Sequence, residues 1–312
     1  MTTAAFSSAR PLRIGTRRSP LALAQAEMTA AAIRLAHGLA EDAVVLVSML
    51  ASGDKIQDRP LADIGGKALW TKELERALVD DQIDVGVHSM KDVETVRPDI
   101  FTIAAMLPRA DVRDRLIGAA SVDALPQGAR VGTSSPRRAA QMLRLRPDLR
   151  IVPLRGNVAT RLARIEAGEA DATLLAAAGL DRLGMGNTGH AIAAEQMLPA
   201  ASQGAVGIDR LTARKDLAPL LAAINHVPTF TAVMAERAFL EALGGNCHSP
   251  VAALATMADD MIDLMAQAFN ADGSHMQAGH IRFAVDDYRA PARLAADMLA
   301  GAHLSITALF NP

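Results

Sequence analysis

A short polar run follows an apolar segment near residue 90. Residues 87–93 begin apolar and then carry Ser89, Lys91 and Asp92. The apolar start predicts a strand, so we expect Asp92 at or just beyond its end. A carboxylate there can stabilise a developing cation or move protons. A helix cap, or a salt bridge to Lys91, would explain the same residue.

Arginine is concentrated in the middle of the chain. Residues 130–182 contain ten Arg, no Lys and five acidic residues, a balance of +5, whereas residues 228–312 carry a balance of -5. Arg is favoured over Lys for bidentate carboxylate recognition, so the pattern indicates an anion site. A solvated basic face is the alternative. The arginines near expected strand ends and helix starts are Arg137, Arg138, Arg155, Arg161 and Arg182.

The single cysteine, Cys247, lies in a glycine-rich polar loop at residues 244–250. One cysteine cannot form an intramolecular disulfide. A lone cysteine is usually a small buried hydrophobe, but these polar neighbours could also favour a reactive thiolate. The eight His show no convincing ligand spacing, so no metal site is expected.

The elements that must position these residues alternate between strand and helix over the first two thirds of the chain. We expect strands at residues 12–15, 43–50, 83–88, 101–107, 130–132, 150–154 and 171–177. Helices are expected from Ser19-Pro20 to Gly38, over 69–79, from Ser135-Pro136, and from Asn157 to Gly168. Such alternation predicts parallel sheets, whose carboxyl ends line the binding crevice.

Two helix starts share one motif. Gly-Thr precedes Ser-Pro at residues 15–20 and again at residues 132–136. Each turn presents free backbone N–H groups and the positive end of a helix dipole, so two facing a cleft would grip an anion from both sides. Because the motif is short, chance resemblance is an alternative.

The tail predicts a small α+β unit. Helices are expected at residues 231–242 and 291–300, with strands at 251–257, 262–269 and 281–285. Net charge is -2 and aromatics are 3%, which disfavour a nucleic-acid partner. No signal peptide and no 18-residue apolar span are visible, so we expect a cytoplasmic protein without a membrane partner.

A series of short motifs runs along almost the whole chain. They are residues 13–23, 65–67, 72–75, 88–92, 132–135 with Arg137-Arg138, 154–158 with 160–162, 178–180 with Arg182-Leu183, 203–205, 235–239, and Gly245, Cys247 and Pro250. In this order they resemble the porphobilinogen deaminase (hydroxymethylbilane synthase) family. Departures from the family pattern are Trp70, Glu94, Pro136 and Asp209; none removes a catalytic or anchoring residue.

The resemblance implies a fold of three domains. Two are α/β domains of the periplasmic-binding-protein type (type II) flanking a cleft, and the third is a small α+β C-terminal domain. The implied boundaries are 1–107 with 203–224 for domain 1, 108–202 for domain 2, and 228–312 for domain 3.

The resemblance also implies a reaction. Family members deaminate porphobilinogen and join four molecules into the linear tetrapyrrole hydroxymethylbilane, releasing ammonia. A dipyrromethane cofactor, attached by a thioether to the cysteine that matches Cys247, primes the chain. The aspartate that matches Asp92 stabilises the positive charge on pyrrole nitrogens. The substrate is then the small molecule porphobilinogen, and a monomer is expected.

The remaining site residues follow from the same resemblance. The stretch 51–66 would form a mobile lid beside Lys67. Residues implied to bind cofactor or substrate are Arg17, Ser19, Lys67, Ser89, Lys91, Thr133, Ser135, Arg137, Arg138, Arg155, Arg161 and Arg182.

A non-catalytic, two-lobed anion-binding protein is the rival hypothesis. It explains the arginines and the strand–helix alternation. It does not explain the single cysteine in its loop or the polar run that ends at Asp92. A covalent pyrrolic adduct would discriminate, because only the enzyme carries one.

Overall fold

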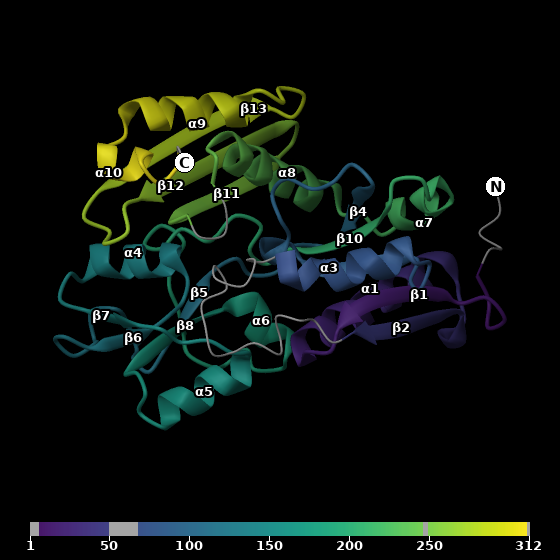
Figure 1. Ribbon diagram of the computed structural model, residues 1–312, viewed down its shortest axis with the longest axis horizontal. Helices are drawn as coiled ribbons and strands as arrows, with labels where there is room; N and C mark the ends of the chain where they lie inside the picture. The colour runs from purple at the N-terminus through teal and green to yellow at the C-terminus, as the bar shows by residue number, and fades with distance from the viewer. Residues whose placement is uncertain (1–5, 50–67, 246–248, 311–312) are drawn as a thin grey trace. The chain divides into compact units, whose positions relative to one another are not determined.

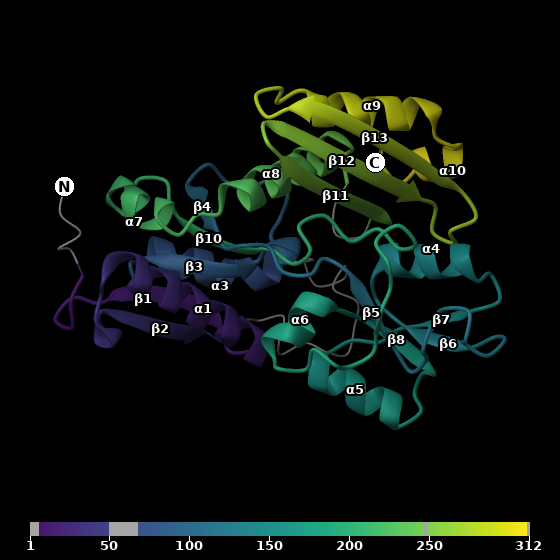
Figure 2. The same ribbon diagram turned by 180° about the vertical axis from the view of Figure 1, so that it is seen from behind.

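The computed structural model describes residues 6–49, 68–245 and 249–310 (Figures 1 and 2). The chain forms two compact units: unit 1 comprises residues 1–109 with 205–230, and unit 2 comprises 110–204 with 231–312. The chain therefore passes between the units after Arg109, after Gly204 and after Phe230. The division into three domains with the boundaries given above stays a prediction.

Unit 1 is built on a five-stranded mixed sheet. Its strands are β1 (Leu12–Arg17), β2 (Val44–Met49), β3 (Val85–Ser89), β4 (Phe101–Met106) and β10 (Val206–Leu211), in the order β2-β1-β3-β10-β4. The strands β1, β2 and β3 are parallel, whereas β10 runs antiparallel to both of its neighbours. Its helices are α1 (Pro20–His37), α3 (Ala68–Val79) and α7 (Ala218–Ala222), with short 3₁₀ turns at Glu41–Ala43, Met90–Asp92 and Lys215–Leu217.

Unit 2 contains a second five-stranded sheet. Its strands are β5 (Asp114–Ile117), β6 (Arg130–Gly132), β7 (Arg150–Val152), β8 (Ala172–Ala176) and β9 (His190–Ala191), in the order β7-β6-β8-β5-β9. Three strands are again parallel, namely β6, β7 and β8, and β5 is antiparallel to β8 and β9. The helices are α4 (Pro136–Leu145), α5 (Val158–Glu166) and α6 (Ala177–Arg182).

The rest of unit 2 is an antiparallel sheet with helices. Its strands β11 (Val251–Ala258), β12 (Met261–Phe269) and β13 (Met276–Ala284) lie in sequence order. The helices are α8 (Val227–Ala242), whose first residues belong to unit 1, α9 (Ala290–Gly301) and α10 (Leu304–Thr307). Helix α4 packs against β11 and β12.

The two five-stranded sheets share one plan, which accounts for the repeated Gly-Thr and Ser-Pro motif. In each, the first parallel strand along the chain lies between the second and the third, and an antiparallel strand follows. The first strand leads into a helix capped by Ser19 in unit 1 and by Ser135 in unit 2, and Pro is at the helix start in both. The motif therefore marks equivalent positions in two similar sheets.

Local sequence explains where α1 begins and ends. The Ser19 side chain accepts a hydrogen bond from the backbone N–H of Ala22, and Pro20 opens the helix. Gly38 adopts the left-handed conformation with φ 61°, which ends the helix as expected. One face of α1 buries Ala26, Ala30 and Ile33 against the apolar side of the sheet.

The predicted fold class is confirmed, since two α/β sheets and a smaller α+β part are present. All the strands and helices predicted above are present among the described residues, although β13 begins five residues before the predicted start and α8 begins four before. The apolar runs did not predict β5, β9, β10, α6, α7 and α10. Strand β5 was missed because it opens with Asp114 and Arg115, charged residues whose placement depends on partners far along the chain.

Within the described ranges, no single helix is long and apolar enough to cross a membrane. One pair of helices, Lys215–Ala222 and Val227–Ala242, is together long and apolar enough for a membrane span, but the two are bent by 118° relative to each other.

The fully buried Glu236 of α8 joins two separate segments of unit 2. Its carboxylate accepts hydrogen bonds from the backbone N–H of Ser202 at 2.5 Å and of Ala255 at 2.7 Å. Ser202 has φ +65°, a conformation that costs free energy for a residue with a side chain. The carboxylate thus fixes a strained turn to β11.

Replacing Glu236 with Gln should lower the free energy of unfolding by about 1–3 kcal/mol. An amide has one acceptor oxygen, so its NH₂ group must face one of the two backbone donors. Urea unfolding measures the loss, with Glu241→Gln on the exposed side of α8 as the matched control. Equal stability of the two variants would contradict the role of Glu236.

Candidate functional site

The parallel strands of unit 1 end at one edge of the sheet and bring the first group of candidate residues together. Strand β1 ends at Arg17 and β3 ends at Ser89, and the 3₁₀ turn after β3 ends at Asp92. Asp92 is therefore just beyond the strand end, as predicted. The Ser89 hydroxyl accepts a hydrogen bond of 2.7 Å from Gln25 of α1, which links the two chain segments. The five candidates at this edge are all half-buried: Arg17, Ser19, Ser89, Lys91 and Asp92.

A buried charged cluster anchors the chain on both sides of Asp92. His88 Nε2 lies 3.0 Å from Asp209 Oδ1, and Arg97 donates to Asp209 Oδ2 at 2.6 Å and lies 3.3 Å from Glu75. Burial alone would raise the pKa of Asp209, but His88 and Arg97 outweigh it and hold that pKa below its ordinary value. Burial raises the pKa of Glu75. The sequence analysis noted Asp209 only as a departure from the family pattern and missed Arg97.

The second group of candidates lies at the matching edge of unit 2. Thr133 follows β6; its backbone N–H donates to Val152 at the end of β7, and its hydroxyl accepts from the Ser135 N–H at 3.1 Å. Ser135 in turn caps α4, whose first turn contains no acidic residue. The positive end of this helix dipole is therefore not offset by its own first turn.

Three arginines of unit 2 are half-buried. Arg155 follows β7, Arg161 lies in α5 and donates from Nε to the Gly156 carbonyl at 2.9 Å, and Arg182 ends α6 and donates to the Gly204 carbonyl at 2.7 Å. Each follows the carboxyl end of a parallel strand, as predicted.

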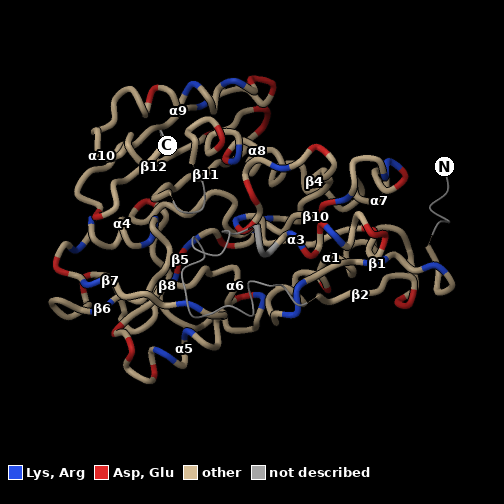
Figure 3. Tube along the Cα trace, in the orientation of Figure 1, with Lys and Arg blue, Asp and Glu red and all other residues tan. Residues whose placement is uncertain are grey.

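Two other arginines of the basic segment are paired with acidic side chains. Surface ion pairs hold Arg130 to Asp171 and Arg146 to Asp148, and the trace shows acidic residues among the basic ones (Figure 3). Arg130 and Arg146 therefore belong to a solvated face of the protein, which was the alternative to an anion site.

Arg137 and Arg138 are buried rather than exposed in a crevice. Both donate to the fully buried carboxylate of Asp114, at 2.7 and 2.6 Å. Arg137 also donates to Gln141 and to the Leu198 carbonyl, and Arg138 to the Leu174 carbonyl. Burial would raise the pKa of Asp114, but the two guanidinium charges outweigh it, so the pKa is lowered. Sequence reasoning missed Asp114 altogether.

The donors of unit 2 fit a ligand that carries several carboxylates, as a dipyrromethane cofactor does. Arg182 retains a buried Nε–H with no hydrogen-bond partner, and the same holds for Arg137 and Arg138. Buried donors without acceptors are uncommon in folded proteins, and a carboxylate would satisfy them. The residues present therefore suit the group.

Some predicted residues lie outside the described residues. These are Cys247, Lys67 and the predicted lid at 51–66. Within the described ranges, no group of three or more His, Asp or Glu side chains could hold a metal ion.

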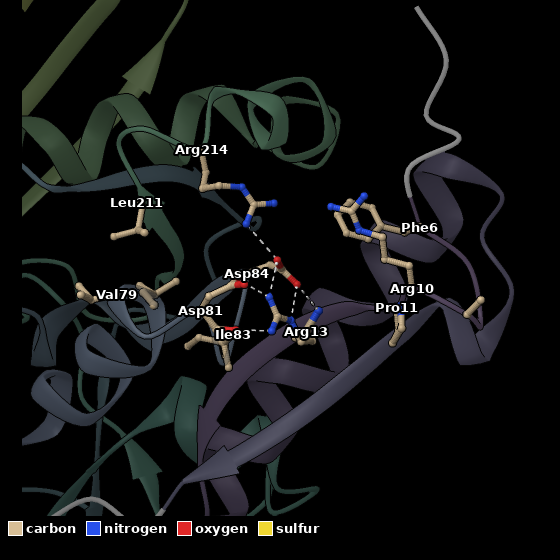
Figure 4. A pocket seen from close by; sticks show the side chains of 12 residues that line it. Phe6, Arg10, Pro11, Arg13, Val79, Asp81, Ile83, Asp84, Leu211 and Arg214 are labelled. Carbon is tan, nitrogen blue, oxygen red and sulfur yellow. Dashed lines mark hydrogen bonds and ion pairs between the residues drawn. The ribbon is translucent and has the colours of Figure 1, made fainter.

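A cavity of about 590 Å³ lies at the other edge of the unit 1 sheet (Figure 4). It opens beside the start of β1 and the residue before β3, so the length of a six-residue strand, about 20 Å, separates it from the edge with Asp92. Two of its arginines are paired with a carboxylate: Asp84 binds both Arg13 and Arg214, at 3.0 and 3.1 Å. Ligands of α/β sheets bind at the carboxyl ends of strands, so this cavity is not the candidate site.

Asp84 should stabilise unit 1 in a pH-dependent way. Burial would raise the pKa of Asp84, but the hydrogen bonds from Arg13 and Arg214 hold it below its ordinary value. A depressed folded-state pKa gives stability that is present above the unfolded value of about 3.9 and is lost as the pH falls toward the folded value.

Accordingly, Asp84→Asn should cost about 1–3 kcal/mol of unfolding free energy at pH 7. The difference from the unsubstituted protein should shrink as the pH falls below about 4. Urea unfolding over a pH series measures both effects, and the exposed Asp80→Asn is the control. A difference independent of pH would show that the Asp84 charge contributes nothing.

Two sheets of one strand plan, each with cationic and hydroxyl side chains after its parallel strands, define a two-unit α/β protein. A family model described as "Porphobilinogen deaminase, dipyromethane cofactor binding domain" matches residues 12–218. A second, "Porphobilinogen deaminase, C-terminal domain", matches residues 230–300. The chain belongs to the porphobilinogen deaminase family.

Two curated relatives carry the name of the same family, and the chain is also similar to solved structures at much lower identity. The porphobilinogen deaminase of Sphingopyxis alaskensis is 58% identical over 96% of both chains. That of Paracoccus denitrificans is 49% identical over 86% of this chain and 87% of its own. Among solved structures, a TRAP periplasmic solute binding protein from Desulfovibrio salexigens matches at 11% identity with a TM-score of 0.40, over 71% of this chain and 73% of its own.

Proposed function

We propose that this protein is a transferase of tetrapyrrole and haem biosynthesis, a hydroxymethylbilane synthase. It deaminates four porphobilinogen molecules and joins them into linear hydroxymethylbilane, releasing ammonia. The observation that carries the proposal is the match of both family models and of a 58% identical relative over nearly the whole chain. The arrangement of Asp92 beside half-buried donors supports it. A non-catalytic anion-binding receptor would need these donors, but it would not need the Asp92 carboxylate beside them.

Asp92 is the catalytic carboxylate in this proposal. It ends the 3₁₀ turn after β3, beside the end of β1. When substrate loses ammonia and the new carbon–carbon bond forms, positive charge appears on a pyrrole nitrogen. Asp92 accepts a hydrogen bond from that N–H, offsets the charge, and takes part in proton transfer.

The cationic and hydroxyl side chains hold the substrate. Each porphobilinogen unit carries an acetate and a propionate, so the growing product is a polyanion. Guanidinium groups bind carboxylates through paired, charge-assisted hydrogen bonds, which orient the ring as well as attract it. The residues assigned to binding are Arg17, Ser19, Lys67, Ser89, Lys91, Thr133, Ser135, Arg137, Arg138, Arg155, Arg161 and Arg182.

Cys247 is the proposed attachment point of the dipyrromethane cofactor. When bound, the cofactor supplies the pyrrole carbon to which the first substrate is joined. The side chains of unit 2 that follow its parallel strands are the proposed partners of the cofactor carboxylates. The proposal also includes three domains, a monomeric state and a cytoplasmic location.

The intact mass of the denatured protein tests the proposed function directly. We expect a covalent increment equal to two deaminated porphobilinogen units, because a thioether survives denaturation. Cys247→Ser should carry no increment and should not turn over porphobilinogen. If the bare chain mass persists after incubation with porphobilinogen, or if Cys247→Ser is fully active, the assignment is wrong.

Asp92→Asn should retain the cofactor increment but lose most of the turnover. A neutral amide cannot offset the developing positive charge, and removal of one such interaction costs about 100- to 1,000-fold in rate. The steady-state rate of bilane formation measures the loss. Asp99→Asn, at an exposed position seven residues further along, is the control. Full activity of Asp92→Asn would remove this residue from the mechanism.

A further inference from the structure

Asp114 is the one described carboxylate that contacts both adjacent arginines of α4. Its side chain is fully buried, and its two oxygens accept from Arg137 at 2.7 Å and from Arg138 at 2.6 Å. A third donor, Gln203 Nε2, lies 3.1 Å from Oδ1. All three partners belong to unit 2 and come from two parts of the chain, the start of α4 and Gln203.

The cluster leaves positive charge and donor capacity unused. Two guanidinium groups face one carboxylate, so the buried group as a whole carries one positive charge. A guanidinium has five N–H groups. Arg138 uses two of them for its side-chain hydrogen bonds, to Asp114 and to the Leu174 carbonyl, and its Nε–H has no partner. A buried cation with free donors is costly unless an anion completes it.

Asp114 also decides how the two guanidinium groups are oriented. Arginine side chains carry about 2 kcal/mol of rotamer entropy, and two like charges on consecutive residues repel. The shared carboxylate of Asp114 restricts the rotamers, because it binds one terminal nitrogen of each guanidinium. Its negative charge also offsets the repulsion between the two arginines. The Leu198 and Leu174 carbonyls then fix the other terminal nitrogens. The Nε–H groups of both arginines are buried and have no hydrogen-bond partner, and the first turn of α4 contains no acidic residue that could compete for them.

We infer that Asp114 is a positioning residue for the proposed reaction: it orients Arg137 and Arg138 so that their remaining N–H groups hold a carboxylate of the pyrrole chain. This inference rests on the proposed function and deepens it. Asp114 touches no substrate itself. It acts through the arginines, and its own negative charge keeps the site at one positive charge rather than two.

Gln203 extends the same cluster to the segments where the chain passes between the units. Its Nε2 donates to the Val112 carbonyl at 2.7 Å as well as to Asp114. The neighbouring Gly204 carbonyl accepts from Arg182 and from the Ala110 N–H. Arginines assigned to carboxylate binding are thus tied to both segments, 110–112 and 203–204.

Steady-state kinetics of the holoenzyme with porphobilinogen test the inference through Asp114→Asn. The amide keeps the shape but loses the charge, so the arginines lose their orientation. We expect KM to rise and kcat/KM to fall about 10- to 100-fold, the equivalent of one charged hydrogen bond, while kcat changes less than 3-fold. Asp111→Asn is the matched control: Asp111 lies three residues before Asp114 and pairs with the exposed Arg113, so this variant should behave as the unsubstituted enzyme.

A double-mutant cycle separates positioning from mere stability. If Asp114 acts through Arg138, then Asp114→Asn should add little to the KM of Arg138→Leu. Additive effects, or a lowered melting temperature with unchanged KM, would overturn the inference. If Asp114→Asn does not fold, Asp114→Glu and Gln203→Leu decide it: a raised KM in both supports positioning, and an unchanged KM in both refutes it.

Failure of the proposed function gives a different result. In that case the unsubstituted protein forms no bilane and carries no covalent increment. An active unsubstituted enzyme whose Asp114 variants keep normal KM refutes the positioning role alone.

Discussion

Each unit depends on one geometric constraint: three parallel strands must end at the same edge of the sheet. In unit 1 that edge brings Arg17 beside Ser89 and Asp92, although more than 70 residues separate them along the chain. In unit 2 it brings Thr133 beside the end of β7. The side chains that follow these strand ends, and the starts of the helices after them, are available for anionic ligands.

Buried ion pairs are the second feature that determines where side chains lie in the two units. Asp209 pairs with the buried side chain of Arg97, and Asp114 pairs with the buried Arg137 and Arg138. A buried ion pair contributes little net stability, but removing one partner is strongly destabilising. Such pairs therefore fix side-chain geometry more than they raise stability. In the proposed function, Asp114 holds two of the arginines assigned to binding without itself contacting the ligand.

The alternation of apolar runs was sufficient to predict the parallel strands and the helices after them, except α6, because these signals are local. Ser19, Ser135 and Asn157 were identified as helix starts, and each caps its helix, since capping depends on the next three residues. Asp114 could not be identified, because its partners lie 23, 24 and 89 residues away. A charged residue is not expected in a buried strand. Only in the folded chain do two guanidinium groups come close enough to pair with the Asp114 carboxylate.

The strand order of unit 1 has a consequence for synthesis of the chain. Strand β10 lies between β3 and β4, yet roughly 100 residues separate the end of β4 at Met106 from the start of β10 at Val206. At about 5–20 residues per second, β4 must wait some 5–20 seconds on the ribosome before its neighbour exists. The five-stranded sheet of unit 2 is complete by Ala191. The part that begins the chain is therefore the later of the two to close its sheet, and its unpaired strand edges are exposed meanwhile to chaperones and to neighbouring nascent chains.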